Sequence, residues 1–120
     1  MRGLTATFLR EKHQAGLDFG AYMRASPSHA DAWRTVHDAT TLNADQHALL
    51  ASFTRQMHVL CLSGSWCGDC VQQGPLLARI AEASPAIDLR WLDRDEHDDL
   101  SSFVTINAGQ RVPTVIFCAE

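Results

Sequence analysis

The N-terminal part of the chain carries apolar side chains three or four positions apart, which is the period of a helix. One apolar stripe lies within residues 4–9, on a helix that is expected to end near Gly16. A second stripe lies within residues 19–23, on a helix that Pro27 is expected to stop. The pattern predicts an all-helical segment over residues 1–57. A strand over the β-favouring residues at its start is the second choice.

Two further helices are expected in this segment. Ser28 can cap the first of them. Asn43, followed three positions later by Gln46, forms a capping box for the second. The apolar face of that last helix is expected to bury Leu49, Leu50 and Phe53.

The period changes after residue 57. Residues 58–63 form an uninterrupted apolar run, which is typical of a strand covered on both faces of a sheet. Residues 87–92 alternate between apolar and polar side chains, which predicts a half-exposed or edge strand. Residues 113–118 predict a third strand, with Pro113 at its start, where a missing amide donor is tolerated.

Helical patterns separate these strands. Residues 67–83 predict a helix that Pro75 should kink, and residues 98–107 predict another. Strands that alternate with helices indicate an α/β fold.

Composition narrows the class of protein. The chain has 120 residues, of which 46% are hydrophobic, so a single domain with a sizeable core is expected over residues 1–120. The net charge of −4 and the lack of a basic cluster argue against a nucleic-acid partner. No apolar run approaches the roughly 18 residues that span a bilayer, and no signal-peptide pattern begins the chain, so we expect a cytoplasmic protein without a membrane partner.

Two of the four cysteines, Cys67 and Cys70, form a C-x-x-C pair where a buried strand gives way to a helix. Cysteines three apart in a first helical turn lie on one face, close enough for a disulfide to open and close. The helix N-terminus should stabilise the thiolate of Cys67, which makes it the expected nucleophile. Cys70, one turn inside, is the expected resolving thiol.

A zinc half-site and a pair of core cysteines are the alternatives for this motif. Zinc needs about four ligands, and the sequence holds neither a second C-x-x-C nor closely spaced histidines. We therefore expect no metal. A bond between Cys61 and Cys118 is conceivable, but both are more readily explained as small core residues.

These residues resemble the thioredoxin family. The resemblance rests on Trp66-Cys67-Gly68-Asp69-Cys70 after an apolar strand, on Pro75, and on Val112-Pro113-Thr114 at the start of a later strand. It covers residues 58–118, and the helical segment before it is similar to that of bacterial thioredoxin-like proteins with an N-terminal extension.

The resemblance implies a thioredoxin-like fold and several site residues. Strand 58–63 would be central, parallel to 87–92 and antiparallel to 113–118, with helices on both faces. The peptide bond before Pro113 would be cis, and the backbone of Val112 would pair with substrate and help keep metals from the thiols. Trp66, Gly68 and Asp69 would tune the active site.

The sequence departs from the family pattern at three positions. Cys61 stands where a buried carboxylate is usual, and Trp91 where a lysine is usual. Asp69 replaces a common proline in the active-site loop. Its charge should oppose the thiolate of Cys67 and make the pair less oxidising.

The function implied is a thiol–disulfide oxidoreductase of the protein-disulfide reductase type, without a bound cofactor. Its substrate would be a disulfide-containing protein or a small thiol, and a reductase or a low-molecular-weight thiol would be the electron donor. Two alternatives remain: a thioredoxin-fold binding or scaffold module with non-catalytic cysteines, and a glutaredoxin-like protein that ligates an iron–sulfur cluster through Cys67. The last strand and helix of the family have no counterpart after residue 118, so the 113–118 edge could pair in a homodimer, or the chain could be a fragment.

Overall fold

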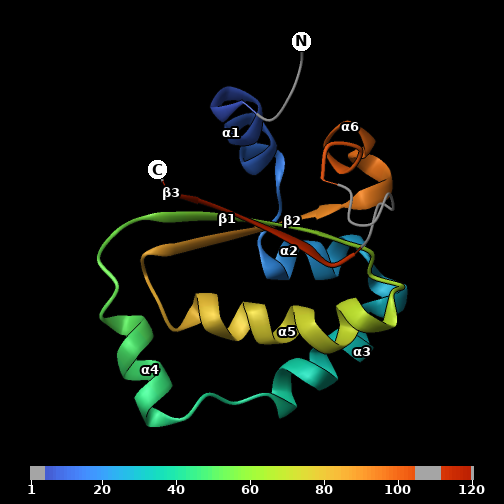
Figure 1. Cartoon of the computed structure of the whole chain (residues 1–120). Helices are drawn as coiled ribbons and strands as arrows, with labels where there is room; N and C mark the ends of the chain where they lie inside the picture. The colour runs from blue at the N-terminus through green and yellow to red at the C-terminus, as the bar shows by residue number, and fades with distance from the viewer. Residues whose placement is uncertain (1–4, 105–111, 120) are drawn as a thin grey trace.

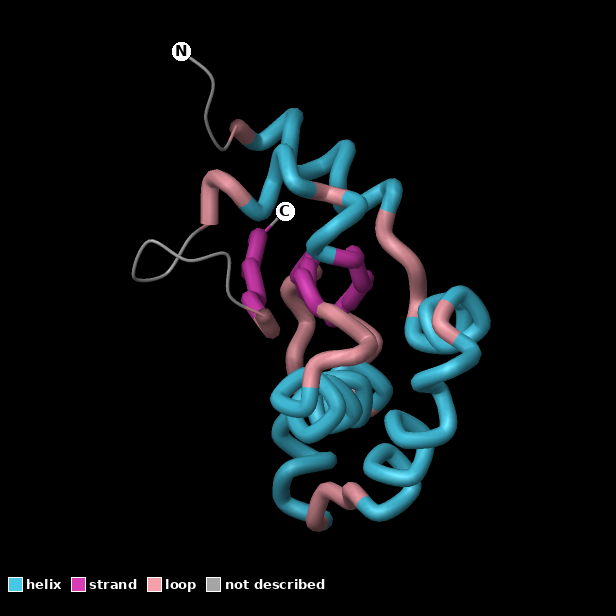
Figure 2. Tube along the Cα trace, turned by 90° about the vertical axis from the view of Figure 1, so that its right-hand side faces the viewer, coloured by secondary structure: helices cyan, strands magenta, loops and turns pink. Residues whose placement is uncertain are grey.

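A computed structural model of the chain describes residues 5–104 and 112–119. In it, a three-stranded mixed sheet lies between helices on both faces, as Figures 1 and 2 show. The strand order is β2-β1-β3, where β1 (Met57–Ser63) is parallel to β2 (Ile87–Asp93) and antiparallel to β3 (Thr114–Ala119). The predicted α/β class, strand positions and strand directions are confirmed.

The helices form two layers. On one face lie α2 (Phe19–Ala25), α3 (Pro27–Ala39) and α5 (Gly68–Glu82), and on the other lie α1 (Ala6–Ala15) and α6 (Asp98–Ser101) (Figure 1). A short 3₁₀ helix, η1 (Arg94–Glu96), precedes α6, and α4 (Ala44–Ala51) lies between α3 and β1 in sequence. No helix in the described part of the chain is long and apolar enough to cross a membrane.

The face that α2, α3 and α5 cover has an aromatic core, which we call the aromatic face. Trp33 and Trp91 are almost completely buried there, with ring centroids 5.5 Å apart in an edge-to-face arrangement. Tyr22 stacks on Trp91 at 5.6 Å. α5 packs closely against Trp33, because a Cβ on Gly74 would lie only 2.2 Å from its ring.

The face that α1 and α6 cover has an aliphatic core, which we call the aliphatic face. Its fully buried members come from β1, β2 and α6, and partly buried side chains of α1 pack against them. Along β1, side chains that face the aromatic core alternate with side chains that face the aliphatic core, as the two-residue period of a strand requires. The buried members are Leu60, Leu62, Leu92 and Leu100.

Side-chain caps explain where three helices begin. Thr5 accepts a hydrogen bond from the Phe8 amide, and Asp18 accepts one from the Ala21 amide. The predicted capping box of Asn43 and Gln46 is present at α4. The prediction of a Ser28 cap was wrong, because α3 begins at Pro27, whose fixed φ suits the first helical position.

Two helix predictions need correction. No side chain of α4 is buried, and Leu49 is 61% exposed, because this short helix lies outside the two layers over the sheet. The helix predicted over residues 98–107 ends at Ser101. The Ser101 and Ser102 hydroxyls donate to the Asp98 carbonyl and compete with continued helix, while residues 105–107 lie outside the described part.

Both edges of the sheet are as expected from the pattern. β2 is an edge strand, with Trp91 and Leu92 buried and the rest of the strand half-buried. β3 forms the other edge among the described strands, and Phe117 on it is 67% exposed. The predicted homodimer through this edge stays a prediction.

Candidate active site

The turn between β1 and α5 positions the cysteine pair. β1 ends at the fully buried Ser63, and the Cys67 amide donates to the Gly64 carbonyl at 2.9 Å, which closes the turn. From below, the Trp33 indole donates to the Ser65 carbonyl at 2.9 Å in a buried hydrogen bond. The aromatic core therefore fixes the loop that carries the first cysteine.

Cys67 is the N-cap residue of α5, and its extended backbone makes no side-chain capping bond. Its side chain is half-buried, so the sulfur stands at the surface next to the unpaired amides of the first turn. Those amides and the helix dipole favour a negative charge at this position.

Cys70 lies one turn further into α5 and has no exposed surface. Burial raises the pKa of its thiol to about 12, a hydrogen bond with the Gly64 backbone lowers it, and the neighbouring Cys67 and Asp69 raise it. Cys70 therefore holds its proton at neutral pH. Both cysteines are free thiols in this structure.

The start of β3 completes the site from the other side. The Val112–Pro113 peptide bond is cis, as expected. The Cys67 Sγ lies 4.0 Å from the Val112 carbonyl oxygen, although 45 residues separate the two in sequence. The fold thus places the backbone before Pro113 beside the exposed thiol.

Trp66 and Arg94 form the rim of the site. Trp66 is 50% exposed, and the Arg94 guanidinium lies 5.1 Å from its ring centroid. Gly64 makes room for that ring, since a Cβ there would lie 2.5 Å from it. Sequence reasoning missed Arg94. The signal was its place just after β2, because the carboxyl ends of parallel strands lie at one edge of a sheet.

Beneath the cysteine pair lies a layer of thiols and hydroxyls. Cys61, at the position where the family has a carboxylate, is fully buried, and burial raises the pKa of its thiol. The Tyr22 hydroxyl and the Ser63 Oγ are 2.6 Å apart in a buried hydrogen bond, and burial also raises the pKa of Tyr22. Sequence reasoning missed this bond, because 41 residues separate its partners. The one available signal was the hydroxyl of Tyr22 within an apolar stripe.

The fold separates Cys61 from Cys118. Cys61 pairs with Val115 in the β1/β3 ladder, whereas Cys118 pairs with His58. The two cysteines are therefore three positions out of register and on opposite faces of the sheet, beyond the reach of a disulfide. Both are free thiols, so the interpretation without a bond is confirmed.

Comparisons with known proteins agree with this geometry. A sequence model of the family described as thioredoxin matches residues 16–120. No curated protein sequence matches the chain.

Two crystal structures share its fold. A protein of unknown function from Pseudomonas aeruginosa has 20% identity and a TM-score of 0.79, over 100% of this chain and 72% of that one. An HIV epitope-scaffold has 21% identity and a TM-score of 0.77, over 92% of this chain and 70% of the scaffold. At this level of identity the likeness shows the fold alone.

Proposed function

Because the chain belongs to the thioredoxin family, we propose that it is a thiol–disulfide oxidoreductase in which Cys67 is the nucleophile and Cys70 the resolving thiol. The observation that carries the proposal is the difference between the two cysteines. One sulfur is accessible at a helix N-terminus, and the other is buried one turn away. Two cysteines that only filled the core would not need one accessible sulfur and one buried sulfur.

The reaction begins with the Cys67 thiolate, which attacks one sulfur of a substrate disulfide. A Cys67–substrate disulfide forms, and the other substrate sulfur leaves as a thiolate. Cys70 then attacks Cys67, the mixed disulfide breaks, and the second substrate sulfur is released. The substrate gains two electrons, and the dithiol of Cys67 and Cys70 becomes a disulfide.

The proton of Cys70 must move during the second step, because its pKa is raised to about 12. The Cys61 thiol at the family's carboxylate position cannot act as a base while burial keeps it protonated. The leaving substrate thiolate is the acceptor that the reaction itself supplies. Resolution is therefore coupled to departure of the substrate.

The surroundings of Cys67 suit an extended peptide substrate. The Val112 carbonyl, 4.0 Å from the Cys67 Sγ, can accept a backbone hydrogen bond from a chain laid across the site. The half-exposed Trp66 offers an apolar contact beside it. A low-molecular-weight thiol or a reductase would restore the dithiol after each turnover.

Reduction of insulin by the purified protein, with dithiothreitol as electron donor, tests this function. Cys67→Ser should abolish the activity. Cys70→Ser should stall after the first step and accumulate a mixed disulfide, which non-reducing electrophoresis detects. Cys118→Ser is the matched control, because it removes a thiol from the opposite face of the sheet, and it should keep full activity.

A different result would favour a binding module. If the parent protein reduces neither insulin nor a small disulfide, or if Cys67→Ser is as active as the parent, the proposed role of the pair is wrong. Equal activity of Cys70→Ser and the parent would remove the resolving role alone.

A further inference from the structure

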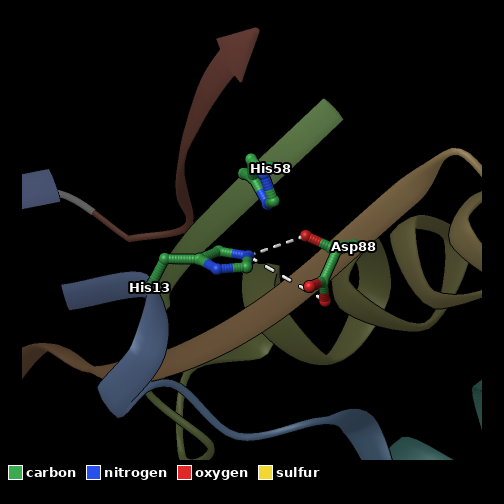
Figure 3. Close-up of side chains that lie close together, drawn as sticks. All are labelled: His13, His58 and Asp88. Carbon is green, nitrogen blue, oxygen red and sulfur yellow. Dashed lines mark hydrogen bonds and ion pairs between the residues drawn. The ribbon is translucent and has the colours of Figure 1, made fainter. Parts of the chain in front are cut away.

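A second group of chemically active side chains lies on the aliphatic face, away from the cysteine pair. His13 comes from the last turn of α1, His58 from the start of β1, and Asp88 from the start of β2. Figure 3 shows the three side chains close together between these elements, with His13 facing Asp88. Nothing in the proposed redox reaction uses them.

The distances within this cluster fit the ligands of one metal ion. One ligand atom from each residue lies within 4.8 Å of the others. His13 Nε2 donates a hydrogen bond to the backbone carbonyl oxygen of Asp88 at 2.9 Å and lies 3.9 Å from the carboxylate Oδ1, so a bound ion would replace the proton on this nitrogen. Ligand atoms around a tetrahedral zinc ion are roughly 3.4 Å apart, so small side-chain rotations would close the site.

One atom of the cluster lacks a partner. His58 Nδ1 is buried and accepts or donates no hydrogen bond among the described residues. A buried polar nitrogen without a partner costs free energy, which a bound ion would recover. The His13 and His58 rings meet edge to face, with centroids 4.9 Å apart, so neither ring satisfies that nitrogen through a hydrogen bond.

The cluster opens into a cavity of about 490 Å³. Its lining includes His13, His58 and Asp88, together with Cys118 at the far strand. An ion bound by three protein ligands would therefore keep a fourth position open to water or to a small ligand in the cavity.

We propose that His13, His58 and Asp88 bind a divalent transition metal ion of the zinc class. Two imidazoles and one carboxylate form a ligand set that such ions accept, and calcium and magnesium, which prefer oxygen ligands, do not suit it. The ion ties α1 to the two parallel strands.

Two arginines beside the cluster set its affinity. Arg90 Nε lies 3.2 Å from Asp88 Oδ1, the carboxylate oxygen that also faces His13 Nε2, so an ion would bind Asp88 through Oδ2 or share Oδ1 with the arginine. Arg10 also lines the cavity, and its positive charge opposes a cation there. Arg10→Gln is therefore expected to strengthen metal binding.

Zinc titration of the full-length Cys67→Ser/Cys70→Ser protein, in competition with a chromophoric chelator, tests the proposal. The double substitution removes the cysteine pair as a competing zinc site. One zinc ion per chain is expected. His58→Gln and Asp88→Asn should each weaken its binding by roughly tenfold or more, and the exposed controls His47→Gln and Asp38→Asn should leave it unchanged.

Thermal unfolding separates ligand loss from misfolding. Zinc should raise the Tm of the double-substituted protein and of the controls, but not that of Asp88→Asn, whose side chain is half-exposed and whose fold should survive. The proposal is wrong if the Cys67→Ser/Cys70→Ser protein binds no zinc, or if His58→Gln and Asp88→Asn bind it as tightly as the controls. Neither result bears on the cysteine pair, because insulin reduction measures that function separately.

Discussion

The two faces of the sheet differ in how they are built. The aromatic face is packed by interlocking rings from three elements, with Trp33 touching both the sheet and α5. The aliphatic face has a smaller core, which α1 and the short α6 cover among the described helices, and a cavity opens beside it.

The cysteine pair stands on the aromatic face. The Trp33 indole holds the Ser65 carbonyl, and Ser65 lies in the turn that carries Cys67. A thiol pair that must open and close in one geometry benefits from such support. The aliphatic face instead has a cavity with room for a ligand, beside the cluster of His13, His58 and Asp88. The face filled by rings therefore carries the cysteine pair, and the face with the cavity carries the histidine cluster.

The largest expected effect comes from removing the aromatic support. Trp33→Ala should lower the free energy of unfolding by about 3–5 kcal/mol, because it empties the centre of the aromatic core. Leu9→Ala, at a partly buried side chain of the aliphatic face that lines the cavity, should cost only about 1–2 kcal/mol. Urea unfolding followed by far-ultraviolet circular dichroism measures both.

Equal costs for these two variants would contradict the comparison. Insulin reduction under conditions where both variants are folded adds a second measurement. Trp33→Ala should lose activity beyond its loss of stability, since the hydrogen bond to the Ser65 carbonyl is gone. Leu9→Ala should keep the activity of the parent.

Local pattern was sufficient to predict the aromatic face in outline. The strand of residues 58–63 and the helix of residues 67–83 each agree with the structure to within one residue, because their apolar runs are long and begin and end at clear signals. The cysteine pair was visible for the same reason, as it lies within one turn of a single helix.

The cluster on the aliphatic face could not be found this way. His13, His58 and Asp88 are far apart in sequence, and only the pairing of β1 with β2 brings two of them side by side. The register of His58 with Asp88 could have been predicted, because each is the second residue of a strand. The position of α1 could not be predicted, since helix packing depends on contacts that no local pattern records.

An intermediate effect follows from raising the pH. Burial raises the pKa of Cys61, Cys70 and Tyr22, all on the aromatic face, above their ordinary values of 9.0 for a thiol and 10.0 for a phenol. The unfolded chain therefore loses these protons first. The free energy of unfolding should be constant below about pH 8 on this account and fall above pH 9, by about 1.4 kcal/mol per pH unit for each thiol.

Cys61→Ala tests the source of this loss. Under reducing conditions its stability should fall less steeply than that of the parent between pH 9 and 10, because one buried thiol no longer ionises on unfolding. Cys118→Ala removes a thiol from the aliphatic face and serves as the control, with the slope of the parent. A slope unchanged by Cys61→Ala would show that the base sensitivity arises elsewhere.

The smallest effect concerns the charge of Asp69, next to the cysteine pair. Asp69 is exposed in the first turn of α5, between the two cysteines in sequence, and its negative charge opposes a thiolate at this helix N-terminus. Asp69→Asn should therefore favour the reduced pair and raise its reduction potential, by at most roughly 30 mV because the side chain is solvated.

Equilibration of the cysteine pair with glutathione measures this potential. Asp45→Asn is the matched control, because Asp45 occupies the first turn of α4 and its loss weakens a helix dipole contact without touching the thiols. Both variants should lose a similar small amount of stability, while only Asp69→Asn moves the potential. If the two variants have the same potential as the parent, Asp69 stabilises the helix and does not tune the cysteine pair.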